Sequence, residues 1–511
     1  MQAMNETPPV DGPPHALPAG LAATLVFVAS GAILVLEVVA LRLVGPYVGV
    51  TLQVSSSVIG IALAAIAYGA WMGGFLADRR DPRTLLAPAL VLAGIATAVT
   101  LPVVRYSGEA LRGNAAGAVL LLTALAVFVP AALLAAVTPL VVKLQLSDLR
   151  RTGQVVGKLS SIGTLGGITA TLGTGFVLVA ALPSSAIILT LAVVLGLAGL
   201  ALGLYLRRRD HTGTPAPVRT KAVVAVLALA GAGLGATAPT PCDVETAYHC
   251  ARVEADPDRA SGRLLLLNSA HHSYVDLAEP RYLEFAYTQW LGAIADVVAP
   301  AGTPVDTLHL GGGGFTMPGY LTATRAGSRQ RVLELDGQLV ELDRERLGLR
   351  TGTDLAVEVG DARVNLARQA TDGYDLVIGD AFGHLVVPWH LATREMAADI
   401  DRVLRPGGVY AQNVIDQPPS RFIRAEVATV AATFAEVAVL APPEALAGQR
   451  GANFVIVASD RPLPLAALRA RLDDLAEEPV TLLTGPELDT FVGGARVLTD
   501  DFAPVDQLLA G

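Results

Sequence analysis

The sequence predicts a multi-domain chain, in which a polytopic all-α transmembrane bundle of about seven helices precedes a soluble α/β domain. Three observations support this. Hydrophobic residues make up 52% of the 511 residues, which is above the usual range of soluble proteins. Apolar stretches near the roughly 20-residue length of a membrane span recur between residues 21 and 240. After residue 240, short β-type runs alternate with amphipathic stretches, as in a parallel sheet covered by helices.

Residues 1–20 are polar and proline-rich and contain neither Lys nor Arg, so they do not make a secretory signal and we expect a disordered tail. The transmembrane bundle is expected over residues 21–240. Small residues are frequent in its spans and allow helices to approach closely, which predicts compact packing. The seventh span is the weakest because it is short and rich in Ala and Gly. The predicted spans are 21–44, 56–77, 84–105, 115–142, 157–181, 184–206 and 222–239.

Positive charge in the short loops predicts the orientation of the bundle. Alternate loops carry twelve Lys and Arg residues, whereas the opposite loops carry only Arg42, Arg105 and Arg112. Lys and Arg are retained on the cytoplasmic side during insertion. Seven spans therefore place the N-terminus in the cytoplasm and the soluble domain, residues 241–511, outside it. A miscount of one span would reverse the placement of the soluble domain.

The composition argues against a nucleic-acid-binding surface and leaves the role of the two cysteines open. The net charge of -9 comes without a basic block, which argues against a nucleic-acid partner. Cys242 and Cys250 are the only cysteines and lack the spacing of a zinc site. They could close a small disulfide loop in an oxidising compartment, and two free thiols fit the sequence equally well.

Glu37 within an apolar span suggests either a transport or lipid-headgroup role or a structural acid bonded to a neighbouring helix.

A glycine run in LHLGGGGF, residues 308–315, follows the first strand of the alternating series. Glycines at Gly311, Gly313 and Gly314 would allow a tight turn and the close approach of a ligand to the backbone. A flexible structural turn would have the same composition. The position of the run between a predicted strand and a helix favours a binding role.

Acidic residues stand at the ends of the next three predicted strands. Glu334 ends the second strand, where Rossmann-like domains place an acid that accepts hydrogen bonds from ribose hydroxyls, and Asp336 is expected to cap the following helix. Asp361 follows the third strand and fits either an adenine contact or a helix cap equally well. Asp380 follows the fourth. Because ligands bind at the carboxyl edge of open α/β sheets, the set predicts a nucleoside pocket there.

These motifs together resemble the spermidine synthase family of aminopropyltransferases. The likeness rests on the glycine turn, LELD at 333–336, GD at 360–361, Asp380 and LRPGGVYAQN at 404–413. It extends upstream to YLEFAYTQWL at 282–291, and covers about residues 248–460. The membrane half resembles the bundle of fused, membrane-bound members. The resemblance implies a Rossmann-like domain of the S-adenosylmethionine-dependent methyltransferase type with an N-terminal β segment.

By this resemblance, decarboxylated S-adenosylmethionine is the donor, Glu334 binds its ribose and Asp361 its adenine. Asp380 takes the proton from an attacking amine, and Tyr287 helps to position that acid. His272 lies where the resemblance suggests a substrate-facing residue, and a metal is not required. His384 is a second substrate candidate near the same edge, although a polar loop residue is the alternative for both histidines.

The sequence departs from the family pattern at two acids. Gly314 stands where the family carries an aspartate that meets the donor's amine, and the D-S-S-D-P run is replaced by residues 380–384, DAFGH. A methyltransferase that uses ordinary S-adenosylmethionine on a lipid or small amine is therefore the second hypothesis. A transporter or binding protein with a non-catalytic nucleoside domain is the third. The expected partners are a small amine or lipid headgroup and the lipid bilayer, and a homodimer is left open.

Overall fold

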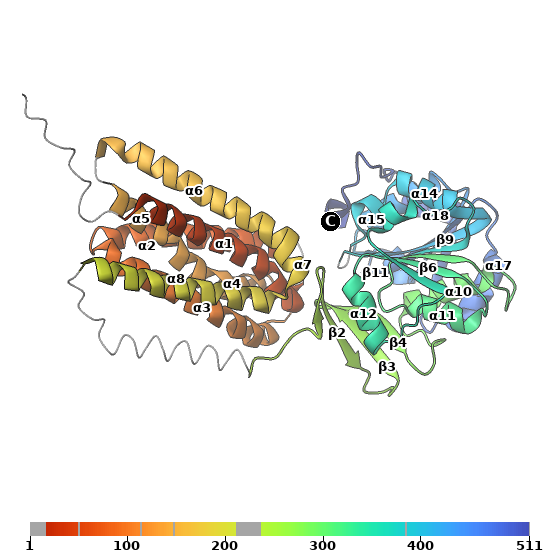
Figure 1. Cartoon of the computed structure of the whole chain (residues 1–511). Coiled ribbons are helices and arrows are strands. Elements are labelled where there is room, and N and C mark those ends of the chain that lie inside the picture. Colours follow the sequence, from red (N-terminus) through yellow and green to blue (C-terminus); the bar gives the residue numbers. More distant parts are fainter. Residues whose placement is uncertain are drawn as a thin grey trace, which may run out of the picture. The chain divides into compact units, whose positions relative to one another are not determined.

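The computed structural model describes residues 17–49, 52–112, 115–146, 149–210, 237–383 and 386–509. The chain divides into two compact units, Met1–Cys250 and Ala251–Gly511 (Figure 1). The first unit is helical, and the second contains a large sheet with helices on both faces. The predicted fold class, a transmembrane-type helical bundle followed by a Rossmann-like α/β domain, is confirmed.

The described part of the first unit contains six helical spans that are long and apolar enough to cross a membrane. They correspond to the first six predicted spans and are longer by several residues. Residues 222–236 of the predicted seventh span lie outside the described residues. The helices are α1 (Ala19–Val48), α2 (Leu52–Ala77), α3 (Pro82–Ala110), α4 (Ala116–Ala135) with α5 (Val137–Gln145), α6 (Thr152–Gly173) with α7 (Val179–Ala181), and α8 (Ser184–Asp210).

Small residues determine how closely these helices pack. A Cβ atom at Gly69 of α2 would lie 2.1 Å from the carbonyl oxygen of Ala132 in α4, and one at Gly166 of α6 would lie 2.3 Å from that of Phe27 in α1. Both distances are far below van der Waals contact, so the backbones could not approach this closely with any side chain. The small residues therefore act as predicted, as close-contact points of the bundle.

Residues 240–250, at the end of the first unit, are cross-linked to each other and hydrogen-bonded to α1. Cys242 and Cys250 form a disulfide, so the first of the two cysteine interpretations is the one observed. The guanidinium of Arg42 in α1 donates to Glu245 Oε1 at 3.2 Å and to the carbonyl oxygen of Ala247 at 2.6 Å. Glu245 belongs to the short strand β1 (Val244–Glu245). Arg42 was expected in a loop, whereas it lies within α1 and has a structural role.

The second unit is organised around an eight-stranded sheet in the order β12-β10-β11-β9-β8-β5-β6-β7. The five strands from β9 to β7 are parallel, and β11, β10 and β12 add antiparallel pairs at one side. This mixed arrangement is common in doubly wound sheets. The strands are β5 (Thr307–Leu310), β6 (Gln330–Glu334), β7 (Leu355–Val359), β8 (Tyr374–Gly379), β9 (Leu404–Asp416), β10 (Glu436–Ala441), β11 (Ala452–Ser459) and β12 (Thr481–Thr484).

Alternate side chains of the strands enter two separate cores. In β8, Leu376 and Ile378 join the core on one face, whereas Val377 joins the core on the other. This alternation follows from the two-residue period of a strand. Figure 1 shows the helices on the two faces of the sheet. One face carries α10 (Ala286–Val297), α11 (Thr316–Thr324) and α17 (Leu465–Leu475), and the other carries α14 (Arg394–Val403), α15 (Arg421–Ala431) and α18 (Gly485–Val492).

A smaller antiparallel sheet precedes the large one. It contains β2 (Cys250–Ala255), β3 (Gly262–Leu267) and β4 (Ala270–Asp276). The sequence predicts one extended segment over 262–277, but the structure turns at Asn268, whose φ of 56° is in the left-handed region. Asn tolerates that region better than most residues, which explains the hairpin. The hairpin brings β4 toward the glycine turn that follows β5.

Candidate active site

The predicted site residues follow four strands that are neighbours in the sheet. The strands β8, β5, β6 and β7 are neighbours in this order. Their carboxyl ends carry Asp380, the glycine turn, Glu334 and Asp361, respectively. Parallel strands are about 4.8 Å apart, so the row extends about 14 Å from the first strand to the fourth. The sheet therefore lines up the four motifs along one carboxyl edge, although they are spread over 70 residues of sequence.

The glycine turn is packed too tightly for side chains. Gly311 has a φ of 93°, and a Cβ atom there would lie 2.5 Å from the carbonyl oxygen of Asp380. Gly313 has a φ of 51°, and a Cβ atom there would lie 2.8 Å from Ser273 Oγ of β4. The amide of Gly314 donates to the same Oγ at 3.0 Å. Glycine is therefore required by both backbone conformation and close approach.

Glu334 is fixed by backbone amides on both sides. Its Oε2 accepts a hydrogen bond from the amide of Gly312 at 2.7 Å, and its Oε1 accepts one from the amide of Asp336 at 2.8 Å. Burial raises the pKa of Glu334, and these two hydrogen bonds oppose the shift. A carboxylate oxygen can accept more than one hydrogen bond, so each oxygen retains acceptor capacity for a ligand hydroxyl. Asp336 caps α12 (Gly337–Arg346) as expected.

Asp361 has two contacts within the chain. Its Oδ1 accepts from the amide of Val364 at 3.0 Å and caps α13 (Ala362–Leu366), so the helix-cap interpretation is observed. Its Oδ2 lies 3.0 Å from Nε2 of His390.

The guanidinium of Arg363 contacts both carboxylate oxygens of Asp500 at 2.6 Å. The C-terminal segment is therefore attached beside Asp361, rather than free in solvent.

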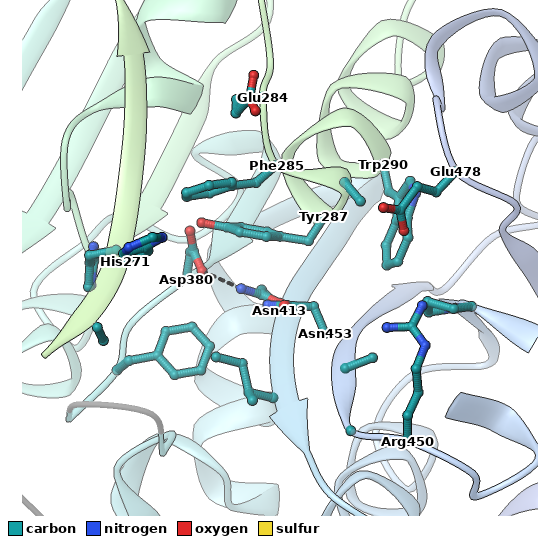
Figure 2. Close-up of a pocket in the computed structure, with 18 residues that line it drawn as sticks. His271, Glu284, Phe285, Tyr287, Trp290, Asp380, Asn413, Arg450, Asn453 and Glu478 are labelled. Atoms are coloured by element: carbon teal, nitrogen blue, oxygen red, sulfur yellow. Dashed lines mark hydrogen bonds between the residues drawn. The ribbon is translucent and has the colours of Figure 1, made fainter. Parts of the chain in front are cut away.

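Asp380 and Tyr287 line a cavity of about 480 Å³ (Figure 2). His272 also lines this cavity. Its Oδ1 accepts a hydrogen bond from Nδ2 of Asn413 at 2.8 Å. Oδ1 of Asn413 in turn accepts from Nδ2 of Asn453 at 2.9 Å. The two amides come from the adjacent strands β9 and β11, so a chain of hydrogen bonds across the sheet orients the carboxyl group.

Burial sets the protonation of Asp380 and Tyr287. It raises the pKa of Asp380 to about 6, although the hydrogen bonds from Asn413 and Tyr287 oppose the shift. The pKa of Tyr287 is raised well above its usual value by burial first, and then by the charge of Asp380 and a hydrogen bond with it. Tyr287 therefore keeps its proton at neutral pH, whereas Asp380 loses its proton just below neutral pH.

The predicted residues do not all face one cavity. Asp380, Tyr287 and His272 line the 480 Å³ cavity, whereas Glu334, Asp361 and the glycine turn are not among its lining residues. His384 lies outside the described residues. Sequence reasoning left other lining residues out of the site: Glu284, Asn413, Arg450, Asn453 and Glu478. Glu284 and Asn413 stand inside motifs quoted from the sequence. Arg450 lies in the loop before β11 and Glu478 in the loop after α17, and neither carries a local signal.

Comparison with known proteins finds relatives named as a polyamine aminopropyltransferase, spermidine synthases and a human methyltransferase-like protein. No family model matches the chain. A polyamine aminopropyltransferase of Vibrio vulnificus is 29% identical over 216 residues, which cover 40% of this chain and 70% of that protein. A solved structure of a probable spermidine synthase from Corynebacterium glutamicum is also 29% identical, and the match covers 50% of this chain and 94% of that one with a TM-score of 0.47. A spermidine synthase structure from Thermotoga maritima is 16% identical, covers 51% and 84% of the two chains, and has a TM-score of 0.34.

Proposed function

Because the α/β unit is spermidine synthase-like, we propose that this chain is a membrane-anchored transferase that moves an aminopropyl group from decarboxylated S-adenosylmethionine to an amine acceptor. Asp380 is the proton acceptor. The observation that carries the proposal is the position of this acid in the cavity wall, oriented by Asn413 and with a pKa of about 6. A carboxylate with a pKa near the working pH is largely deprotonated and is still basic enough to accept a proton, which are the two properties that a general base needs.

The reaction requires one bond to form and one to break. The donor supplies an electrophilic methylene carbon next to a sulfonium centre. The amine nitrogen attacks this carbon, the C–N bond forms, and the C–S bond breaks, with its electron pair staying on sulfur. The proton lost by the amine passes to Asp380, and methylthioadenosine is the uncharged leaving group. The chain contributes by alignment and by proton acceptance, which are the two effects that such a displacement needs.

Tyr287 and Asn413 position the base. Tyr287 retains its proton because of its raised pKa, so it can only donate to Asp380 and does not compete for the substrate proton. Asn413 donates to Oδ1, which fixes the rotation of the carboxyl group. His272 lies at the cavity wall and is proposed to contact the substrate. These contacts hold one carboxylate in a defined direction before the acceptor binds.

The glycine turn, Glu334 and Asp361 are proposed to hold the nucleoside part of the donor. The atoms that exclude side chains from the turn belong to the chain itself. Gly311 and Gly312 are partly exposed, so a ligand would approach the backbone of the turn at these two residues. Glu334 is the proposed partner of the ribose hydroxyls, and Asp361 of the adenine amino group. Because Oδ2 of Asp361 is bonded to His390, adenine would share this oxygen or displace the imidazole.

Methyl transfer is the second candidate function, and one observation favours it. Where the resemblance implies an aspartate against the donor's amine, the chain has Gly314, and a Cβ atom there would lie only 2.9 Å from Cβ of Ser273. The local packing therefore disfavours an acid at this position. Without that acid, preference for the decarboxylated donor over ordinary S-adenosylmethionine is weaker.

By-product analysis tests the proposal. The detergent-solubilised full chain is incubated with each donor and a panel of amines and lipid headgroups, and the nucleoside product is identified by chromatography. Aminopropyl transfer releases methylthioadenosine, and methyl transfer releases S-adenosylhomocysteine. Methylthioadenosine, formed only when both donor and amine are present, is the expected result. If neither nucleoside forms with any acceptor, both transferase functions are rejected.

A further inference from the structure

The cavity beside Asp380 contains a positive charge as well as acids. Its charged lining residues are Asp380, Glu284, Glu478 and Arg450, and Figure 2 labels all four. A diamine acceptor is positive at both ends at neutral pH. A guanidinium in the same cavity repels such a ligand, because like charges in a partly buried site interact more strongly than in water. The cavity is therefore not the all-acidic site that a simple diamine would favour.

The loop before β11 places Arg450 on the edge of the sheet that carries Asp380. Ala452 at the start of β11 pairs with Asp416 at the end of β9, and β9 is the neighbour of β8. Gly379 at the end of β8 pairs with Gln412 of β9, four residues before Asp416. The start of β11 therefore lies two strand spacings across and four residues along from the end of β8, which corresponds to about 16 Å. An acceptor that reaches from Asp380 to Arg450 must be several bonds long.

Close packing constrains the chain next to Arg450. A Cβ atom at Gly451 would lie 2.0 Å from Oε1 of Gln417, so the backbone passes directly against that side chain. Gly451 and Ala452 line the cavity beside Arg450. Gln417 directly follows β9, so this contact places the backbone that carries the guanidinium next to the end of β9.

The contacts of Arg450 leave it available to a ligand. Its ion pair with Glu444 has an N–O distance of 3.9 Å, and the arginine side chain is 49% exposed. Exposed pairs at this separation contribute little. A guanidinium has five N–H donors in a fork that matches a carboxylate or a phosphate. One weak, solvated pair leaves most of these donors for an anionic group.

We propose that the acceptor is a primary amine that also carries an anionic group, a carboxylate or a phosphate, with its amine at Asp380 and its anion at Arg450. This inference rests on the proposed transferase function for the reaction at the amine. It is consistent with Gly314 and Gly383, two positions where the resemblance implies acids and this chain has none. Neither glycine lines the cavity, so the two missing acids indicate a weaker preference for cations around the site, and the positive charge of the cavity itself comes from Arg450.

Matched acceptors that differ only by the anion test the proposal. Ornithine is putrescine with a carboxylate, lysine is cadaverine with a carboxylate, and phosphoethanolamine is ethanolamine with a phosphate. With decarboxylated S-adenosylmethionine as donor, kcat/KM is measured for each through released methylthioadenosine. In at least one pair, the anion-bearing member should be favoured about tenfold or more, the effect of one good charged contact. The favoured pair shows whether the anion is a carboxylate or a phosphate.

Substitutions at Arg450 connect the preference to this side chain. Arg450→Ala should remove the advantage of the anion-bearing acceptor, mainly through KM, and raise kcat/KM for the matched simple diamine, because it removes a repelling charge from the cavity. Arg450→Lys should restore part of the advantage, because it keeps the charge and loses the fork. Arg469→Ala is the matched control, since Arg469 is exposed on α17 and does not line the cavity.

Binding without a donor separates this inference from the proposed function. Calorimetric titration of the full chain with the six compounds requires no transfer reaction. If the anion-bearing amines bind more tightly and Arg450→Ala abolishes the difference, the inference stands even when no methylthioadenosine forms, and only the proposed donor chemistry fails. The inference is overturned if the simple amines bind as well or better, if none of the six compounds binds, or if Arg450→Ala leaves the preference intact.

Discussion

Asn413 of β9 donates its side-chain N–H to Oδ1 of Asp380, across a distance of 2.8 Å between neighbouring strands of the sheet. The hydrogen bond stabilises the charged carboxylate and opposes the rise in pKa caused by burial. The orientation of Asn413 is itself fixed by the N–H of Asn453. The base is therefore positioned by two amides that lie beside it in the sheet but 33 and 73 residues later in the sequence.

Asn413→Leu should raise the pKa of Asp380 further, because it removes a donor to the charged form. A hydrogen bond to a charged group contributes about 1.5–3 kcal/mol, which corresponds to a shift of about one to two pH units. The acidic limb of the kcat/KM profile should move up by that amount. Asn453→Ala, which acts only through Asn413, should move it less. An unchanged acidic limb in Asn413→Leu would show that this contact does not control the base.

Asp380→Asn should stabilise the fold above pH 6. The pKa of Asp380 is raised in the folded state from about 3.8 to about 6, so the unfolded chain loses this proton first as pH rises, and the charged group then destabilises the folded state. The asparagine carries no charge, and its advantage should grow from pH 4 to pH 7 and reach about 1–3 kcal/mol. Denaturant unfolding at pH 4.5 and pH 8 measures it. Equal stabilities at pH 8 would contradict the proposed cost of burial.

Glu334→Gln should weaken donor binding and the local fold together. Both carboxylate oxygens accept backbone amides, and the NH₂ group of glutamine would face one of these donors without an acceptor. A cost of about 1–3 kcal/mol in stability is expected from the unsatisfied group. The Kd of methylthioadenosine, measured by calorimetry, should rise about tenfold or more. Glu345→Gln on the adjacent helix α12 is the control, because this acid is exposed.

Gly314→Asp restores the acid implied by the family pattern but should destabilise the chain. Its Cβ would lie 2.9 Å from Cβ of Ser273, and overpacking of this kind costs about 1–3 kcal/mol. Ser273→Gly in the same chain should recover much of the loss, since it removes the atom in conflict. Thermal unfolding of the two variants provides the comparison. If Gly314→Asp is as stable as the wild type, then Ser273 does not pack tightly against the glycine turn.

Loss of the disulfide between Cys242 and Cys250 should lower the stability of the connecting segment. Closing a loop of this length is worth about 2–3 kcal/mol in the chain-entropy model. Maleimide should react with neither cysteine in the untreated chain and with both after reduction.

We also propose that the α/β unit lies outside the cytoplasm, which agrees with the loop charges and with a disulfide. Cysteines introduced on its surface should then react with an impermeant reagent in intact cells, and reaction only in broken cells would reverse the orientation.

Hydrophobic periodicity was sufficient to predict much of the fold. The first six membrane spans and the alternation of strands and helices after residue 300 both depend on local patterns that the sequence carries directly. The hairpin at Asn268 was missed, because the apolar run LLLL and the following segment read as one strand. The strand β12 and the helix α18 were missed as well, since residues 481–492 carry only a weak signal.

The candidate site was predictable where one strand end carries its own motif. Asp380, Glu334, Asp361 and the glycine turn could each be proposed from the strand that precedes it. Partners that come from distant strands could not. Asn453 and Arg450 reach the cavity because β11 pairs with β9 in antiparallel register, and that pairing joins residues 36 to 48 positions apart in sequence. The His390 contact with Asp361 is of the same kind.

Turnover of Asp380→Asn at pH 8, with the donor affinity measured in parallel, shows whether Asp380 accepts the proton of the attacking amine. We expect kcat to fall by about 10²- to 10⁴-fold, the usual contribution of a general base, while the Kd of the donor changes little. Turnover close to that of the wild type, with donor binding intact, would rule out this role for Asp380.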